Sequence, residues 1–143
     1  MSYLLDTNAV SEWVKPRPDP GIAAWLHEVD EDRTYLSVIT LGELRKGVGR
    51  LAGGRRRDRL DRWLTDELPE RFGGRLLPVD AVVADEWGRL LASAENAGSA
   101  VDDADALIAA TARVHGLRVV TRNVRHFVAT GVDVISPWHD AID

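Results

Sequence analysis

The feature that most constrains the fold is an uninterrupted apolar run, Tyr3 to Leu5, which ends abruptly at Asp6. A short apolar run without alternation is typical of a strand buried on both faces, as in a parallel sheet covered by helices. Residues 8–15 follow with the pattern of a helix that has one apolar side. Asp6 therefore lies at the end of a central strand, the edge at which open α/β sheets bind ligands. Taken alone, Asp6 is also an ordinary helix cap.

The rest of the chain alternates between strand-like and helix-like segments. The predicted strands are 3–5, 34–39, 76–79, 118–121 and 132–135. The predicted helices are 8–15, a segment of about ten residues after Asp19, 40–51, 55–68, 81–97 and 102–115. This order predicts an α/β fold, a three-layer α/β/α domain with a mostly parallel sheet of four or five strands. We expect residues 1–143 to form a single domain.

Composition narrows the class of protein. The chain is 45% hydrophobic, yet no apolar run approaches the roughly 20 residues needed to cross a membrane. The N-terminus lacks the basic and apolar regions of a signal peptide, and there are no cysteines. We therefore expect a cytoplasmic protein without a membrane segment. The net charge of −5 argues weakly against non-specific nucleic-acid binding by the whole surface.

Acidic residues recur at the same end of the predicted elements. Glu43 follows the second strand, and Asp102, Asp103 and Asp105 crowd the first turn of a helix. Each has a local structural explanation, since Glu43 fits a capping box with Thr40 and acids near a helix N-terminus offset its dipole.

The conjunction of these acids with Asp6 is less ordinary. In a parallel sheet the C-termini of strands and the N-termini of helices share one edge, so the carboxylates should converge there. Like charges a few ångströms apart repel, and a divalent cation is the usual resolution. Oxygen ligands suit Mg²⁺ or Mn²⁺, and either ion can activate water and offset charge on a phosphodiester.

Four stretches of the chain resemble one family. They are LLDTNAVSE, LSVITLGELRKGV, DALIAATARVHGLRVVTRNVRHF and GVDVISPW. Together they are similar to PIN domains, and in particular to VapC-type toxins of type II toxin–antitoxin pairs, including the FitB-like branch. The resemblance implies a metal-dependent endoribonuclease that hydrolyses RNA with a metal-activated water. It also implies a homodimer and a cognate DNA-binding, VapB-like antitoxin.

The resemblance also implies roles for individual acids. Asp6, Glu43 and Asp105 are the implied catalytic residues and ligands of Mg²⁺ or Mn²⁺. Asp102 and Asp103 have weaker claims, either as added negative charge at the site or as residues that stabilise their helix.

One position departs from the fullest form of the family pattern. A fourth acid often follows the fourth strand, and Asn123 stands there in this chain. Asn123 can offer a carbonyl oxygen but no charge. The alternative is therefore a catalytically weak or inactive PIN-like module that binds RNA or a partner protein. Thr7 and Thr121 are candidate hydroxyl partners of the site, or ordinary polar residues at strand ends.

Basic residues are concentrated between the second and third predicted strands. They are Arg45, Lys46, Arg50, Arg55, Arg56, Arg57, Arg59 and Arg62. In an acidic protein this asymmetry suggests a surface that contacts RNA phosphates or the antitoxin. A solvated helix face is the equally weighted alternative.

Independently of the family, five tryptophans are many for a chain of 143 residues. Apolar faces around Trp25 and Trp63 that stay uncovered would mark an interface such as a dimer contact.

Overall fold

The computed structural model describes residues 1–139, which contain a five-stranded sheet in the order β3-β2-β1-β4-β5. The strands are β1 (Tyr3–Leu5), β2 (Thr34–Ser37), β3 (Leu76–Leu77), β4 (Arg118–Val120) and β5 (Val134–Ile135). Every neighbouring pair is parallel, and β1 lies in the centre between β2 and β4. The prediction of a mostly parallel sheet around the first strand is confirmed.

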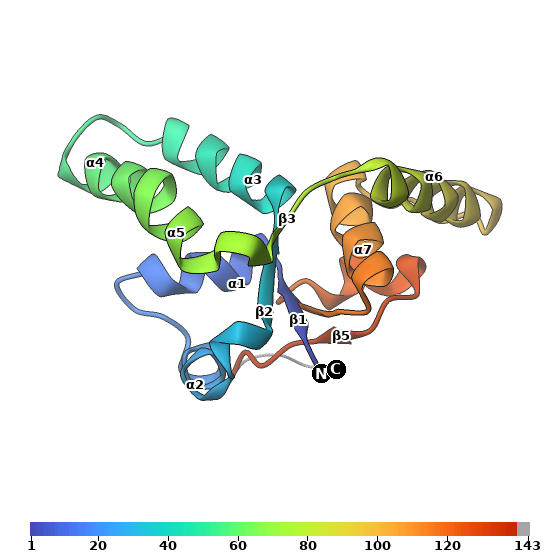
Figure 1. The fold of residues 1–143 in the computed structure, drawn as a ribbon, viewed down its shortest axis with the longest axis horizontal. Coiled ribbons are helices and arrows are strands. Elements are labelled where there is room, and N and C mark those ends of the chain that lie inside the picture. Colours follow the sequence, from blue (N-terminus) through green and yellow to red (C-terminus); the bar gives the residue numbers. More distant parts are fainter. Residues whose placement is uncertain (140–143) are drawn as a thin grey trace.

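Helices cover both faces of this sheet. They are α1 (Thr7–Ser11), α2 (Pro20–Glu28), α3 (Val38–Gly49), α4 (Arg55–Arg62), α5 (Leu68–Phe72), α6 (Ala81–Asn96) and α7 (Asp103–His115). Short helical turns are η1 (Glu12–Val14), η2 (Glu31–Arg33), η3 (Trp63–Glu67), η4 (Gly73–Arg75) and η5 (Val124–Thr130). Figure 1 shows α1 to α5 on one side of the strands and α6 and α7 on the other. The three-layer α/β/α architecture is therefore confirmed.

The strands alternate their side chains between two apolar cores. Leu5 and Val120 belong to the core beneath α1 to α5, and Leu4 and Val119 belong to the core beneath α6 and α7. All four side chains are fully buried. Burial of one such side chain is worth about 1.5–3 kcal/mol, so the hydrophobic effect holds β1 and β4 in their central places.

The boundary between the second strand and its helix differs from the prediction. The strand ends at Ser37, whose hydroxyl accepts a hydrogen bond from the N–H of Ile39 at 3.0 Å and caps α3. Thr40 lies inside the first turn, with its hydroxyl buried and without a hydrogen-bond partner in residues 1–139. The predicted capping box of Thr40 with Glu43 is wrong, because Ser37 already supplies the cap.

Other boundaries moved where a proline or a tight turn intervenes. The predicted helix 55–68 is α4, the π-helical turn η3 and α5, and it continues to Phe72. Pro69 has no N–H to donate to the preceding turn, which accounts for the altered hydrogen-bond register before it. Pro78 ends β3 at Leu77 for the same reason. The segment η5 had no counterpart in the prediction.

The C-terminal ends of β1 and β2 and the N-terminal ends of α1, α3 and α7 meet at one edge of the molecule (Figure 1). Helix α7 runs back along the sheet and is closed by Gly116, whose φ of +66° suits a residue without a side chain. Throughout the described residues, every helix is too short or too polar to cross a lipid bilayer.

Candidate active site

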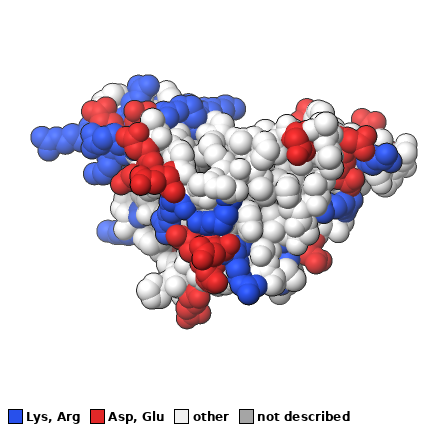
Figure 2. Space-filling view, in the orientation of Figure 1, with Lys and Arg blue, Asp and Glu red and all other residues white. Residues whose placement is uncertain are grey.

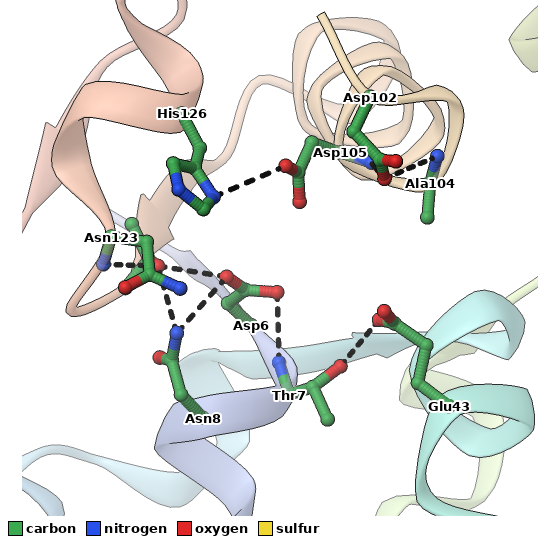
Figure 3. Close-up of polar contacts among 10 residues, drawn as sticks. Asp6, Thr7, Asn8, Glu43, Asp102, Ala104, Asp105, Asn123 and His126 are labelled. Carbon is green, nitrogen blue, oxygen red and sulfur yellow. Dashed lines mark hydrogen bonds and ion pairs between the residues drawn. The ribbon is translucent and has the colours of Figure 1, made fainter. Parts of the chain in front are cut away.

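Asp6 lies directly after β1 and is 5% exposed. Its backbone N–H donates to the C=O of Val120 at 2.9 Å, which ties the strand end to β4. Its carboxylate accepts from the N–H of Thr7 at 2.8 Å and from the hydroxyl of Thr121 at 2.7 Å (Figure 3). Burial raises the pKa of Asp6, and the two hydrogen bonds oppose that rise. Asp6 therefore caps α1 and also presents a desolvated carboxylate at the sheet edge.

Glu43 comes from the second turn of α3 and is exposed. Its Oε1 accepts a hydrogen bond from the hydroxyl of Thr7 at 2.6 Å. The apolar side of α3, with Leu44 and Val48, is buried in the core, which leaves Glu43 facing the N-terminus of α1 (Figure 3).

The three acids at the start of α7 have different contacts. Asp102 caps the helix, since its Oδ2 accepts from the N–H of Ala104 at 3.1 Å and of Asp105 at 3.4 Å. The side chain of Asp105 is 19% exposed and points toward His126, whose Nδ1 lies 3.4 Å away (Figure 3). Asp103 is exposed.

The pKa of Asp105 is raised to about 6. Partial burial is the main cause, followed by the negative charges of Asp6 and Asp102, and Glu43 adds to the rise while His126 opposes it. The carboxylates of Asp6 and Glu43 are thus close enough to repel that of Asp105, although the three come from separate elements.

Two cavities meet at these acids, and both are lined by Glu43, Asp105 and Asn123. The first, called here the Lys15 cavity, has a volume of about 370 Å³ and is also lined by Asp6, Thr7, Asn8, Ser11 and Lys15. The second, called the Arg125 cavity, has a volume of about 530 Å³ and is also lined by Ala100, Val101, Asp102, Arg125, His126 and Ala129. Asp103 lines neither of the two.

The donor set fits a divalent cation. Among the described residues no three acidic or histidine side chains are arranged tightly enough to complete a metal site as they stand. However, Glu43 is exposed and held by one hydrogen bond, so its side chain can change rotamer at little cost. A hard cation such as Mg²⁺ or Mn²⁺ prefers carboxylate oxygens and would relieve the repulsion that raises the pKa of Asp105.

Thr121 and Asn123 complete the floor of the site. The Thr121 hydroxyl donates to Asp6 and accepts from the side-chain N–H of Asn8 at 3.2 Å and from the backbone N–H of Asn123 at 3.0 Å. Thr121 is fully buried, so this network fixes the carboxylate of Asp6.

The basic stretch lies apart from the two cavities. Figures 1 and 2 show the Lys and Arg side chains gathered over α4 and the far end of α3, away from the sheet edge. Two of its members hold the helices together: Arg45 pairs with Asp61 and donates to Thr65 at 2.8 Å, and Arg57 donates to the C=O of Leu51 at 3.3 Å. Lys46, Arg50, Arg55, Arg56, Arg59 and Arg62 are exposed.

Sequence reasoning missed Lys15 and His126. Lys15 was only the last residue of a predicted helix, and His126 lay in a segment with no predicted element. No local pattern marks either residue, because each reaches the site through the path of the chain after its neighbouring element.

Comparison with known proteins agrees with this geometry. Residues 3–132 match the model of the PIN domain. The toxin FitB of Neisseria gonorrhoeae is 41% identical over 137 residues, which cover 96% of this chain and 99% of that protein. The VapC ribonuclease Y4jK of Sinorhizobium fredii is 39% identical over 138 residues, with 96% and 99% covered.

Solved structures agree in fold as well as in sequence. The crystal structure of FitAcB from Neisseria gonorrhoeae superposes with a TM-score of 0.90 at 40% identity, covering 96% of this chain and 99% of that one. A structure of FitAB bound to an IR36 DNA fragment also gives a TM-score of 0.90, at 38% identity and with 96% of each chain covered. The chain therefore belongs to the PIN-domain family, in the group that includes the toxin FitB and the VapC ribonucleases.

Proposed function

We propose that this protein is a metal-dependent endoribonuclease that acts as the toxin of a toxin–antitoxin pair. The observation that carries the proposal is the convergence of Asp6, Glu43 and Asp105 at the junction of two open cavities. The names of its relatives support the assignment, since one is a toxin and another a ribonuclease. Because cellular RNA is the substrate in this proposal, the protein acts in the cytoplasm.

Each residue of the site has a task in this proposal. Asp6, Glu43 and Asp105 hold Mg²⁺ or Mn²⁺, and the bound ion would lower the pKa of a water and offset negative charge on the phosphodiester. The hydroxyl of Thr121 fixes Asp6. The hydroxyl of Thr7 holds Glu43 beside the site until a metal binds. The contact to Asp6 fixes that ligand before RNA arrives, which is how a rigid group in a site lowers the barrier of the reaction.

A second candidate function is a PIN-like module that binds RNA or a partner without cleaving. Asn123 favours it, because an amide stands where the family pattern often has an acid. An uncharged ligand weakens the attraction for a divalent cation, so the two candidates differ in metal-dependent cleavage.

The test measures cleavage of single-stranded RNA in Mn²⁺ and in EDTA. We expect metal-dependent cleavage by the wild type and its loss in Asp6→Asn and Asp105→Asn. The matched control is Asp103→Asn, which removes the same charge from the first turn of α7 but lies outside both cavities. Cleavage by Asp105→Asn at the wild-type rate would contradict the assignment, and folded wild type that never cleaves would favour the binding module.

The partner in this proposal is a cognate antitoxin. One solved relative is a member of the VapBC family of toxin–antitoxin systems, and FitAB and a VapBC were solved bound to DNA. A basic side chain of the antitoxin that enters the acidic site would compete with the metal for Asp6, Glu43 and Asp105. We expect an antitoxin stripped of its basic residues near the site to inhibit less, and unchanged inhibition would refute this competition.

We also propose a homodimer. Trp13, Trp25, Trp63 and Trp87 are only partly buried, whereas Trp138 is 4% exposed. Partly exposed tryptophans are typical of association surfaces. Light scattering of the purified chain should give the mass of a dimer, and a monomer at every concentration would exclude it.

A further inference from the structure

Lys15 and Arg125 lie in different cavities on either side of the acids. Lys15 lines one cavity together with Asp6, and Arg125 lines the other together with Asp102. The two cavities share Glu43 as well as Asp105. An elongated ligand that passes from one cavity to the other therefore meets the Lys15 side chain, then the carboxylates, then the Arg125 side chain.

Lys15, which lines its cavity, is paired with a buried carboxylate. Glu12 is 2% exposed, and its Oε2 accepts from Nζ of Lys15 at 2.5 Å. The other oxygen of Glu12 accepts from the N–H of Asp19 at 2.8 Å, which fixes the carboxylate. An ammonium group has three N–H donors, and Glu12 uses one of them. Two donors of Lys15 are therefore available to a ligand, on a side chain that is 46% exposed.

Arg125 is available in a different way. It is exposed, and its side chain has no hydrogen bond or ion pair with any residue in the described part of the chain. The next residue, His126, is turned toward Asp105 at 3.4 Å, which places this turn of η5 over the acids (Figure 3). A planar guanidinium that has no internal partner suits a phosphate, which it can bind with two N–H groups.

The charge balance of the site gives these cations a task. An RNA phosphate that approaches Asp6, Glu43, Asp102 and Asp105 is repelled, and one divalent cation offsets only part of that charge. Phosphate contacts from Lys and Arg position a nucleic acid beside a reactive centre. The basic residues of α4 cannot do so at this point, because they lie at the far end of α3 (Figure 2).

We infer that Lys15 and Arg125 bind the RNA phosphates on opposite sides of the scissile one, so that the strand crosses the carboxylates from one cavity to the other. This inference rests on RNA being the ligand, as the proposed function states. Both are positioning residues, since neither contacts the acids that hold the metal. The competing explanation is that Lys15 only neutralises Glu12 and that Arg125 is an ordinary surface residue.

The first measurement is the salt dependence of RNA binding in Ca²⁺, with the RNA checked by gel to be intact afterwards. For single strands, log K falls with log salt by about 0.7 for each phosphate that the protein neutralises. We expect Lys15→Gln and Arg125→Gln each to reduce the slope by about 0.7, and the double variant by about 1.4. The matched control is Arg33→Gln, which removes one charge at the opposite end of β2 and should keep the wild-type slope.

The second measurement is single-turnover cleavage in Mn²⁺. A contact made equally with bound substrate and transition state changes the concentration for half-maximal rate but not the maximal rate. We expect each variant to need about tenfold more RNA, with the maximal rate retained. Lys15→Arg and Arg125→Lys should restore most of the affinity, which a loss of folding would not allow.

The outcomes separate the inference from the proposed function. Slopes that match Arg33→Gln in both variants overturn the inference, whether or not the protein cleaves. If Lys15→Gln lowers the melting temperature, Arg125→Gln alone decides, since Arg125 has no internal contact to lose. RNA binding with the expected slopes but without cleavage supports the inference and refutes the nuclease. A folded wild type that binds no RNA overturns both.

Discussion

Asp105 is a carboxylate that the fold holds at an energetic cost. Its pKa is raised to about 6, whereas an Asp in an unfolded chain titrates near about 3.9. Between these two values the folded chain binds more protons than the unfolded chain, so the free energy of unfolding falls as the pH rises through this window. Above it the whole penalty remains. A position that costs stability at neutral pH is typical of a functional site.

We predict that Asp105→Asn raises the melting temperature in EDTA at about pH 7.5 but not at about pH 4. The amide removes the cost of burying a charge and the repulsion from Asp6, Asp102 and Glu43, both of which exist only when Asp105 is ionised. Asp103→Asn is the control, because it removes an acid from the same helix turn and reports the loss of the favourable dipole interaction alone. A lower melting temperature for Asp105→Asn than for Asp103→Asn at neutral pH would contradict the prediction.

Single residues also show how far the sequence alone can lead. Asp6, Glu43 and the cluster of Asp102, Asp103 and Asp105 could be predicted to converge, because each follows a strand or opens a helix at one sheet edge. Only the family resemblance singled out Asp105 within that cluster. Asp102 and Asp103 could not be ranked, since only the packed helix shows that Asp102 is its cap. The capping box of Glu43 with Thr40 fits the sequence pattern but not the structure, in which the partner of Glu43 is Thr7.

At the scale of elements, the start of α2 and the residues that follow β5 depend on each other. The carboxylate of Asp19 accepts from the N–H of Gly21 at 3.0 Å and also from the N–H of His139 at 2.8 Å. A Cβ at Gly21 would lie 2.3 Å from the C=O of Pro137 and 2.5 Å from the N of His139. Backbone approaches this close leave room for glycine only.

Gly21→Ala should therefore lower the melting temperature, although a Gly to Ala change inside a helix normally stabilises by up to about 1 kcal/mol. Gly47→Ala is the control, because nothing lies within 4 Å of a Cβ at that position of α3. The two variants should shift thermal unfolding in opposite directions. A Gly21→Ala protein as stable as Gly47→Ala would mean that the C-terminal segment is not packed there.

The elements were more predictable than their ends. Apolar runs and helical spacing marked all five strands and most helices, because burial on both faces of a parallel sheet leaves a clear pattern. Ser37 and Thr40 are both good caps, so the start of α3 depended on how far β2 pairs with its neighbours. The segment η5 has neither period, and its place is set by Phe127, which is fully buried in the core beneath α6 and α7.

Across the whole molecule, the acids of the site and the basic stretch lie in different regions. Asp6, Glu43 and Asp105 line the two cavities at the strand ends, whereas the basic residues of the α3–α4 region are gathered at one extremity, with acidic residues beside them (Figure 2). The net charge of −5 is therefore unevenly distributed, because a cationic surface and an anionic cavity lie apart. An antitoxin or an RNA that touches both regions would be oriented by this arrangement before it docks.

The stability of the whole chain should respond to metal, and Asn123 sets how strongly. A ligand that binds only the folded protein adds about 2.7 kcal/mol to the free energy of unfolding at a hundredfold excess over its Kd.

Asn123 lines both cavities beside Glu43 and Asp105, so Asn123→Asp adds a carboxylate to a site that already holds several. That variant should melt below the wild type in EDTA and gain more than the wild type from millimolar Mn²⁺. Asn96→Asp, at the exposed C-terminal end of α6, lowers the melting temperature in EDTA slightly through the helix dipole, but it should leave the gain from Mn²⁺ unchanged. Equal gains for the wild type and Asn123→Asp would show that position 123 does not face the metal, and no gain in either protein would remove the metal site itself.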